Sequence, residues 1–468
     1  MKVPVLLRMP REVRAEVVHM TVPVLVEQAL ISSMGLVGMM LASRLSEYAA
    51  APIGMVDAVH TLFVLFFTSL GAGATVVVAQ HTGRGETRVA NEAARQSMVT
   101  AIIVSVVLVG ILSFTGMPLL HLLYGQQQDD IALGLSQYLY PSLFSYPVLA
   151  IVTVGCGVLR GAGDMRTPMV ITVFMGVLNT VLAWVLIYGL QLGVLRIPGL
   201  GIAGAAWALL VSRAIGAVLV LYVLLKGQRS VRMTLRGFRF QLPMQRELFA
   251  IGLPVTAENV LFQVGKLITQ VIVVASGPQH TTAMVIANSI FVFICLPGNA
   301  FSIAAMPIVG QSIGRGQHDD ARERLLYVNA LSCLGLLLTC VAMMVFAYPL
   351  IGLFTTNNEV AAIVYRMLVL CIIFMPTSWS FSFVLSAGLK GAGDTKYSLI
   401  TTIIGMWLFR VLFGYVLGIV FHMGAVGIWL AMCIDWVVRG ILYAIRLRGN
   451  RWFRNALPPR EEPAEAEG

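Results

Sequence analysis

The stretch GVLRGAGD covers residues 157–164, and AGLKGAGD covers residues 387–394 of the same chain. Nearly the same eight letters are thus written twice, 230 residues apart. Their glycine spacing fits neither of the phosphate-binding patterns G-x-G-x-x-G and G-x-x-x-x-G-K-[ST]. The repetition therefore indicates a duplicated architecture rather than a nucleotide site.

Composition places the chain in a lipid bilayer. Of the 468 residues, 58% are hydrophobic and 12% are charged, against about 25% charged in a soluble globular domain. The six cysteines lie in apolar segments without metal-ligand spacing, and the seven histidines form no ligand pair. We therefore expect small buried cysteines, with no disulfide, metal or organic cofactor.

Twelve apolar segments are long enough to cross about 30 Å of hydrocarbon, and they predict an all-α membrane protein. They cover approximately residues 17–43, 52–80, 94–115, 132–158, 168–190, 200–225, 248–276, 281–310, 325–348, 360–388, 397–420 and 424–446. The first is too long for the core of a signal peptide, so no cleaved signal is predicted.

The distribution of basic residues predicts the orientation. Of the 32 Lys and Arg residues, 25 fall in the termini and in loops on one side, and two, Arg44 and Arg196, fall in the opposite loops. Because basic loops remain in the cytoplasm, we expect both termini there, in the inner membrane of a bacterium. The net charge of +10 follows from this asymmetry and requires no nucleic-acid partner.

Other motifs repeat at almost the same offset. VPVLVEQ at 22–28 matches LPVTAEN at 253–259, and VAQHTGRGE at 78–86 matches VGQSIGRGQ at 309–317. Both GAGD copies fall in basic loops, so two halves of six spans each insert in the same direction. Such halves are related by an axis along the membrane normal, with substrate handled between them.

The repeat predicts five parts of the chain: a lead-in (1–16), an N-lobe (17–225), a basic linker (226–247), a C-lobe (248–447) and a tail (448–468). In each lobe GAGD is expected to form a tight turn between the fourth and fifth spans. Its glycines permit positive φ and its aspartate caps the next helix, at Gly161, Gly163, Asp164, Gly391, Gly393 and Asp394.

Taken together, the paired motifs resemble those of the multidrug and toxic compound extrusion (MATE) transporters. The resemblance covers roughly residues 15–447 and rests on AQHTGRG, GQSIGRG, LRGAGD, LKGAGD and the P-x-x-x-E openings. It implies a V-shaped pair of six-helix lobes, and because one chain contains both lobes we expect a monomer. It also implies that organic cations or other small amphiphiles leave through a central cleft, in exchange for protons or sodium.

The sequence departs from this family in one respect. The phrase GLVGM at 35–39 has Gly38 where many relatives carry an aspartate, and span 10 lacks a carboxylate that some relatives have there. The cation site of those relatives is therefore not carried over, and protons are favoured over sodium as the coupling ion.

Three acidic residues within spans, Glu258, Glu27 and Asp57, are candidates for ion coupling, because a charge at mid-membrane costs roughly 2.5–3.5 kcal/mol. Glu27 and Glu258 are repeat-mates, each four residues after a proline. Each lobe would hold one carboxylate that takes up a proton; the alternative is a structural hydrogen-bond partner. Asp57 corresponds to Asn288 and either replaces the missing aspartate or lies near the outer water.

Other side chains within the spans are candidates for the substrate cleft. Lys266, two turns after Glu258, is expected to pair with a carboxylate across the lobe, and Asp435 with Arg439 four residues on. The polar, aromatic and methionine candidates, which alternatively join helices or fill the core, are Gln28, Met34, Tyr140, Asn259, Phe262, Gln263, Lys266, Met284 and Asn288.

Other functions are less consistent with the sequence. A lipid-linked-sugar flippase of the same superfamily would carry cavity arginines for pyrophosphate, and none lies between Val17 and Arg44. A specific-metabolite exporter stays an alternative. A polytopic membrane enzyme would need clustered catalytic carboxylates or histidines, and a primary pump a Walker motif; the sequence shows neither. We therefore predict a transporter and not an enzyme.

Overall fold

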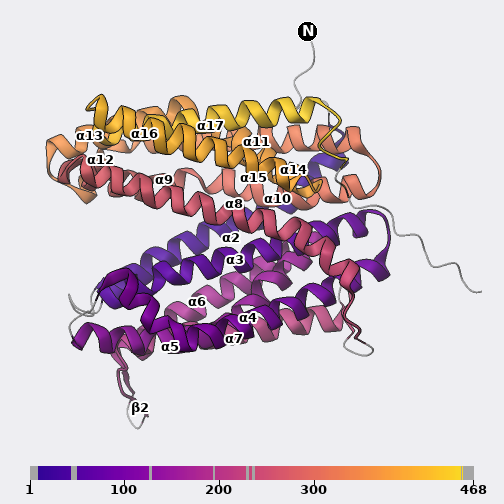
Figure 1. Ribbon diagram of the computed structural model, residues 1–468, viewed down its shortest axis with the longest axis horizontal. Coiled ribbons are helices and arrows are strands. Elements are labelled where there is room, and N and C mark those ends of the chain that lie inside the picture. Colours follow the sequence, from indigo (N-terminus) through magenta and orange to yellow (C-terminus); the bar gives the residue numbers. More distant parts are fainter. Residues whose placement is uncertain are drawn as a thin grey trace, which may run out of the picture.

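The computed structural model describes residues 9–43, 50–125, 129–192, 195–227, 231–234, 238–454 and 456. Two lobes of long helices lie side by side and diverge toward one end (Figure 1). The first lobe contains α2 (Arg11–Ser43), α3 (Ala50–Gly83), α4 (Thr87–Tyr124), α5 (Asp129–Gly161), α6 (Arg166–Tyr188) and α7 (Ile202–Lys226).

The second lobe repeats this plan with more interruptions. It contains α8 (Leu242–Ala275), α9 (Pro278–Ile294), α10 (Leu296–Gly314), α11 (His318–Val345), α12 (Ala347–Phe354), α13 (Asn358–Phe374), η1 (Met375–Trp379), α14 (Ser380–Gly391), α15 (Thr395–Ile403), η2 (Ile404–Leu412), α16 (Phe413–Tyr415), η3 (Val416–Val420) and α17 (Gly424–Arg448).

The twelve predicted spans are confirmed. In the described ranges, eleven helices are each long and apolar enough to cross a membrane, and the pair α9 and α10, bent by 53°, supplies the twelfth. The bend falls at Cys295, and Pro297 lies in the first turn of α10. Proline is tolerated there because its missing N–H would have no intrahelical partner.

Two spans contain π-helical turns. The segment η1 includes Pro376, and η2 occupies nine residues in the middle of the span that starts at Thr395. A π turn adds a residue to the helical turn and so changes which side chains face the lobe interior; such turns are frequent at functional sites.

Two details differ from the predicted fold. Strands β1 (Leu190–Leu192) and β2 (Leu195–Ile197) form a small antiparallel hairpin between α6 and α7, so the fold is not purely helical. In addition, α8 begins at Leu242, inside the segment predicted as a linker, with Pro243 in its first turn. Proline has the φ angle that a first helical turn needs, and this favours the earlier start.

The leading helix of each lobe packs its first half into the other lobe. Val17 and Met20 of α2 share a buried cluster with Ala304 of α10. Conversely, Leu248 of α8 shares a buried cluster with Val77 of α3. The burial of these apolar side chains holds the two lobes together at this end of the molecule.

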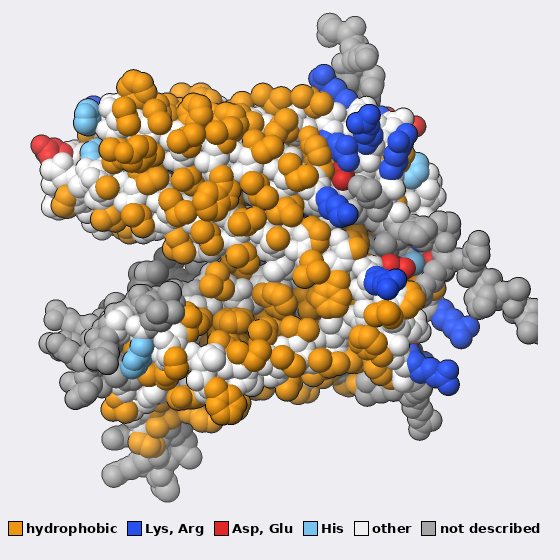
Figure 2. Space-filling model, viewed as in Figure 1, with side chains coloured by type: hydrophobic (Ala, Val, Ile, Leu, Met, Phe, Trp, Pro, Cys, Tyr) orange, Lys and Arg blue, Asp and Glu red, His pale blue; other side chains and the backbone are white. Residues whose placement is uncertain are grey.

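Lys and Arg side chains gather at this same end, which we call the basic end (Figure 2). Hydrophobic side chains cover the length of both lobes, as expected for a surface that faces lipid, and the opposite end is hollowed between the lobes (Figure 2).

Candidate functional site

Two buried glutamines close the basic end. Gln80 of α3 donates from Nε2 to the carbonyl of Gly391 in the other lobe, and Gln311 of α10 donates to the carbonyl of Gly161, each at 3.0 Å. The last carbonyls of a helix have no intrahelical partner. Each glutamine therefore caps a helix of the opposite lobe, and we call the two hydrogen bonds the glutamine latch.

Two glycines allow the lobes to approach closely at the latch. A Cβ on Gly83 would lie 2.2 Å from the carbonyl oxygen of Gln311, and one on Gly314 would lie 2.1 Å from that of Gln80. Any larger side chain would force the helices apart. The repeated AQHTGRG and GQSIGRG motifs thus form the interface between the lobes.

The GAGD turns are confirmed in part. Gly163 and Gly393 have positive φ, at 88° and 89°, as predicted. The prediction is wrong for Gly161 and Gly391, which end α5 and α14 with ordinary φ. A Cβ on either would lie within 2.6 Å or 2.3 Å of a neighbouring helix carbonyl, so close approach selects glycine there.

The two aspartates of the turns differ. The carboxylate of Asp164 accepts hydrogen bonds from the backbone N–H groups of Arg166 and Thr167 at 3.1 Å, which is the predicted cap. Asp394 lies at the N-cap position of α15, but its side chain caps no N–H there and instead accepts Nε of Arg446 at 2.7 Å.

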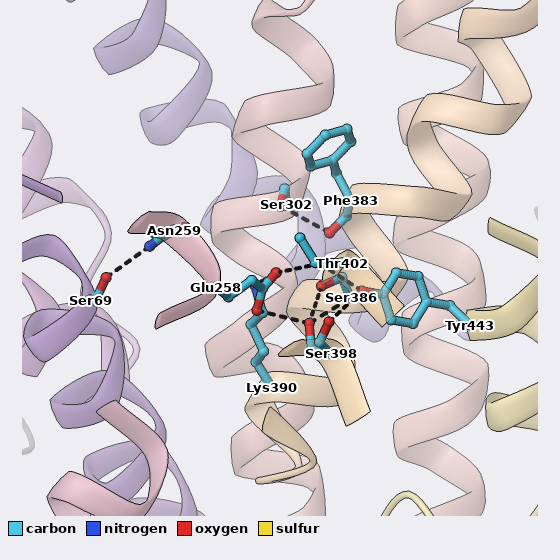
Figure 3. Close-up of polar contacts among 10 residues, drawn as sticks. All are labelled: Ser69, Glu258, Asn259, Ser302, Phe383, Ser386, Lys390, Ser398, Thr402 and Tyr443. Carbon is cyan, nitrogen blue, oxygen red and sulfur yellow. Dashed lines mark hydrogen bonds and ion pairs between the residues drawn. The ribbon is translucent and has the colours of Figure 1, made fainter. Parts of the chain in front are cut away.

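Glu258 lies in the interior of the second lobe, 6% exposed, where three groups contact its carboxylate (Figure 3). Lys390 donates to Oε1 at 2.8 Å, Ser398 to Oε2 at 3.1 Å and Thr402 to Oε1 at 3.1 Å. Lys390 has donors and no acceptor, so its contact with the carboxylate is an ion pair. The lysine comes from LKGAGD and the hydroxyls from the helix that follows it.

Glu27 has similar surroundings in the first lobe, except that its Oε2 has no partner among the described residues where that of Glu258 accepts Ser398. It is 1% exposed, and its Oε1 accepts Arg160 at 2.7 Å and Thr172 at 2.8 Å. Arg160 and Thr172 precede Lys390 and Thr402 by 230 residues, the offset of the GAGD copies. The two lobes therefore hold one buried carboxylate each, paired with the basic residue of its own GAGD motif.

These ion pairs adjoin the glutamine latch. Lys390 is followed directly by Gly391, whose carbonyl Gln80 binds, and Arg160 by Gly161, whose carbonyl Gln311 binds. Each carboxylate therefore attracts a basic residue whose next neighbour in the chain is the glycine that accepts one of the two latch hydrogen bonds.

Asp57 belongs to a second polar group in the first lobe, farther from the basic end. Tyr138 donates to its Oδ1 at 3.1 Å, and the charge of Arg213 lies near enough to attract it. Arg213 donates to Ser145 at 2.7 Å and lies 2.8 Å from Nε2 of His60. Asp57 is thus held in a hydrogen-bonded network.

Lys266 does not form the predicted salt bridge. In the described ranges no carboxylate lies within ion-pair distance of it, because Glu258 is taken by Lys390 and Asp435 by Arg439 at 2.7 Å. The pairing of Asp435 with Arg439 is confirmed. Lys266 instead lines a cavity with Met284 and Asn288, two other predicted cleft residues.

The remaining cleft candidates are dispersed. Asn259 donates to Ser69 of the first lobe at 2.8 Å (Figure 3), and Phe262 lies under two guanidinium groups, those of Arg410 and Arg439, each 5.5 Å from its ring centre. Met34 lines a groove between α2 and α6. The others are half-buried or exposed, at Gln28, Gln263 and Tyr140.

The basic and hydroxyl partners of the two carboxylates, and the arginine beside the cavity, were not predicted from the sequence. Arg160, Lys390, Thr172 and Thr402 could have been found, because each pair recurs at the GAGD offset. Arg410 carried no such signal, since position 180, its counterpart at this offset, is a threonine. Its position in the cavity wall depends on the π-helical segment η2, to which it belongs.

A duplicated bundle of membrane-spanning helices, closed at one end and hollow at the other, defines a transporter and not an enzyme. The model of the MatE family matches residues 23–185 and 254–416, one match in each lobe. The chain belongs to the MatE family of membrane transporters.

Individual relatives agree with this assignment. The uncharacterized transporter YisQ of Bacillus subtilis is 28% identical over 96% of this chain and 98% of its own length. The probable multidrug resistance protein NorM of Thermotoga maritima is 26% identical over 97% of this chain and 96% of its own. The crystal structure of MATE in the straight conformation shares the fold, with a TM-score of 0.86 at 22% identity over 93% of this chain and 95% of that one.

Proposed function

We propose that the protein is a secondary active antiporter that exports drug-like organic amphiphiles, organic cations among them, in exchange for protons, with sodium as the alternative ion. We place it in the inner membrane of a bacterium as a monomer with both termini in the cytoplasm. The observation that carries the proposal is the attachment of each buried carboxylate, through its basic partner, to the glutamine latch.

The positive-inside rule supports the orientation. With the basic end in the cytoplasm, the latch closes the inner side and the hollow between the lobes opens outward (Figure 2). This is the conformation from which a substrate would leave and into which an external proton would enter. Alternating access then requires the lobes to separate at the latch and to close at the other end.

Protonation of Glu258 would weaken the contacts that hold the lobes together at the basic end. A proton on Glu258 removes the charge that holds Lys390 in its ion pair, and with it one restraint on the LKGAGD turn. The hydrogen bond from Gln80 to Gly391 would then be easier to break. Release of the proton in the cytoplasm restores the charge, admits a substrate and drives the lobes back to the outward-open state.

Accumulation of ethidium in everted membrane vesicles tests the proposal, with a proton gradient or a sodium gradient imposed separately. We expect gradient-driven transport in the wild type and its loss in Glu258→Gln. Glu359→Gln is the matched control, because Glu359 is an exposed carboxylate outside the lobe interior that binds only Gln279, at 2.6 Å, among the described residues.

Each outcome has a consequence. Normal transport by Glu258→Gln would return this residue to a structural role and direct attention to Glu27 and Asp57. Loss of transport in the Glu359→Gln control would show that the assay reports damage to the fold. No ethidium transport by the wild type would overturn the drug-export proposal in favour of a specific-metabolite exporter or a lipid-linked-sugar flippase.

A further inference from the structure

Among the described residues, the second lobe has an excess of positive charge around two buried carboxylates, Glu258 and Asp435. Each carboxylate is paired with one basic residue, at 2.8 Å and 2.7 Å. Two further cations, Lys266 and Arg410, have neither an ion pair nor a hydrogen bond within the part of the chain that the structure describes. Arg410 is more than nine-tenths buried, and its Nε lacks any acceptor. The charge of Asp435 also reaches Arg410, but Asp435 is already paired with Arg439. Positive charge is therefore in excess around buried Arg410, which is costly.

Both cations line one cavity of about 50 Å³. Its wall combines these two charges with the polar groups of Gln270 and Asn288 and with an apolar side that includes Met284, Trp429 and Met432. The π-helical segment η2 carries Arg410 into this wall. The chemistry is that of a site for a negatively charged group.

The cavity lies between α8, α9, η2 and α17 of the second lobe. Asn259, Gln263, Lys266 and Gln270 recur at helical spacing and form one polar stripe along α8. The stripe begins at the hydrogen bond from Asn259 to Ser69 of the first lobe. Apolar side chains cover another face of the same helix, where Leu267, Val271 and Val274 are more than half exposed, as on a surface that faces lipid.

The described residues at the corresponding place in the first lobe carry no such pair of cations. At the corresponding junction of α2 and α6, Leu30, Ser33, Met34, Val177, Thr180 and Val181 line a groove without any charged side chain. Lys266 corresponds to Gly35 by the repeat offset, and Arg410 to Thr180. The duplication of the lobes therefore does not account for the two cations. A negatively charged ligand that binds in the second lobe accounts for them.

We propose that this cavity binds the carboxylate of an amphipathic organic anion or zwitterion. The inference rests on the exporter function proposed above and extends its substrate class beyond organic cations. The volume suits one small charged group, since sites for a whole drug-sized ligand measure roughly 300–1,000 Å³. The carboxylate lies between Lys266 and Arg410, Asn288 and Gln270 offer hydrogen bonds, and Trp429 and Met432 contact the apolar part.

Binding of three dansyl probes to the purified full-length protein tests this proposal without any transport step. Dansylglycine carries a carboxylate, dansylglycinamide is its neutral analogue, and dansylcadaverine is a cation. We expect the wild type to bind the acid about tenfold more tightly than the amide, the value for one charge-assisted hydrogen bond. Lys266→Gln is expected to lose most of this preference, and Lys266→Glu to favour the cation.

Matched variants separate recognition from stability. Lys266→Arg keeps the charge and is expected to keep the preference for dansylglycine over its amide. Lys396→Gln removes an exposed lysine near the basic end and is expected to leave this preference unchanged. Because Lys266 is exposed to the cavity, its replacement is better tolerated than that of buried Arg410. Equal binding of acid and amide by the wild type, or an unchanged preference in Lys266→Gln, would overturn the proposal.

The two proposals fail in different ways. Preferential binding of dansylglycine without gradient-driven efflux of any probe would overturn the antiporter function and retain the anion site. Gradient-driven ethidium transport together with equal binding of dansylglycine and its amide would overturn the anion site and retain the antiporter.

Discussion

The glutamine latch gives the most direct test of how the lobes move. The perturbation is the double substitution Gln80→Ala with Gln311→Ala, which removes both donors that join the lobes at the basic end. It leaves the carbonyls of Gly161 and Gly391 without their partners in the closed state. When the lobes separate at this end, water reaches both carbonyls and the loss costs nothing.

The magnitude follows from the burial of the four groups. Both glutamines and both glycines are buried, and a buried carbonyl that loses its partner costs about 1–3 kcal/mol. Two such losses amount to about 2–6 kcal/mol against the closed state. Since 1.4 kcal/mol is a factor of ten, the population open at the basic end is expected to rise at least about 30-fold.

Distances between spin labels measure this population. Labels at Arg88 and Asp319, exposed repeat-mates at the starts of α4 and α11, report the separation of the lobes in a background without the six natural cysteines. We expect the double variant to shift the distribution to longer distances.

A buried amide that binds within one lobe provides the control. Asn329 accepts Ser380 at 3.1 Å, and both residues belong to the second lobe. Asn329→Ala is therefore expected to lower stability without shifting the distance distribution. An unchanged distribution in the glutamine double variant, or an equal shift in Asn329→Ala, would refute the latch as the element that holds the basic end closed.

Three further predictions concern the turns, the interface and the buried ion pair. Gly163→Ala places a side chain at φ 88° and is expected to cost about 1–2 kcal/mol, measured as a lower thermal unfolding midpoint; an unchanged midpoint would contradict it. Gly83→Ala puts a Cβ 2.2 Å from the carbonyl of Gln311 and should produce the same long distances as the latch variant. Asp435→Asn leaves Arg439 buried without its charge partner and should lower the free energy of unfolding by about 3–5 kcal/mol. Addition of Arg439→Gln should restore part of this stability, and unfolding in detergent measures both effects.

Much of the architecture could be predicted from the sequence because it depends on local composition. Apolar segments long enough for a bilayer predicted the twelve spans, and the repeated motifs predicted two equivalent lobes. The pairing of Asp435 with Arg439 followed from helical spacing alone. Such features depend on neighbours in the chain and on the solvent, which the letters of the sequence specify directly.

The candidate site was predicted less completely. Glu27 and Glu258 are recognisable in the sequence as carboxylates in apolar spans, but nothing near them in the chain identifies Arg160 and Lys390 as their partners. Lys266 was expected to pair with a carboxylate, and it lines a cavity with Arg410 instead. These relations join residues more than a hundred positions apart, so helical periodicity does not report them. Only the recurrence of Arg160 and Lys390 at the GAGD offset points to the carboxylate partners, and Arg410 has no such counterpart.

The sequence by itself determined that this protein is a duplicated bundle of helices in a membrane, because hydrophobicity over each span and the recurrence of whole motifs suffice for that conclusion. Only the tertiary structure decided what the motifs do. AQHTGRG and GQSIGRG of each lobe cap the GAGD helix of the other, and Lys266 and Arg410, which lack an ion pair among the described residues, line one cavity. The first feature depends on how two lobes that are far apart in the chain pack against each other. The second depends on which basic residues pair with Glu258 and Asp435 when the helices of the second lobe pack.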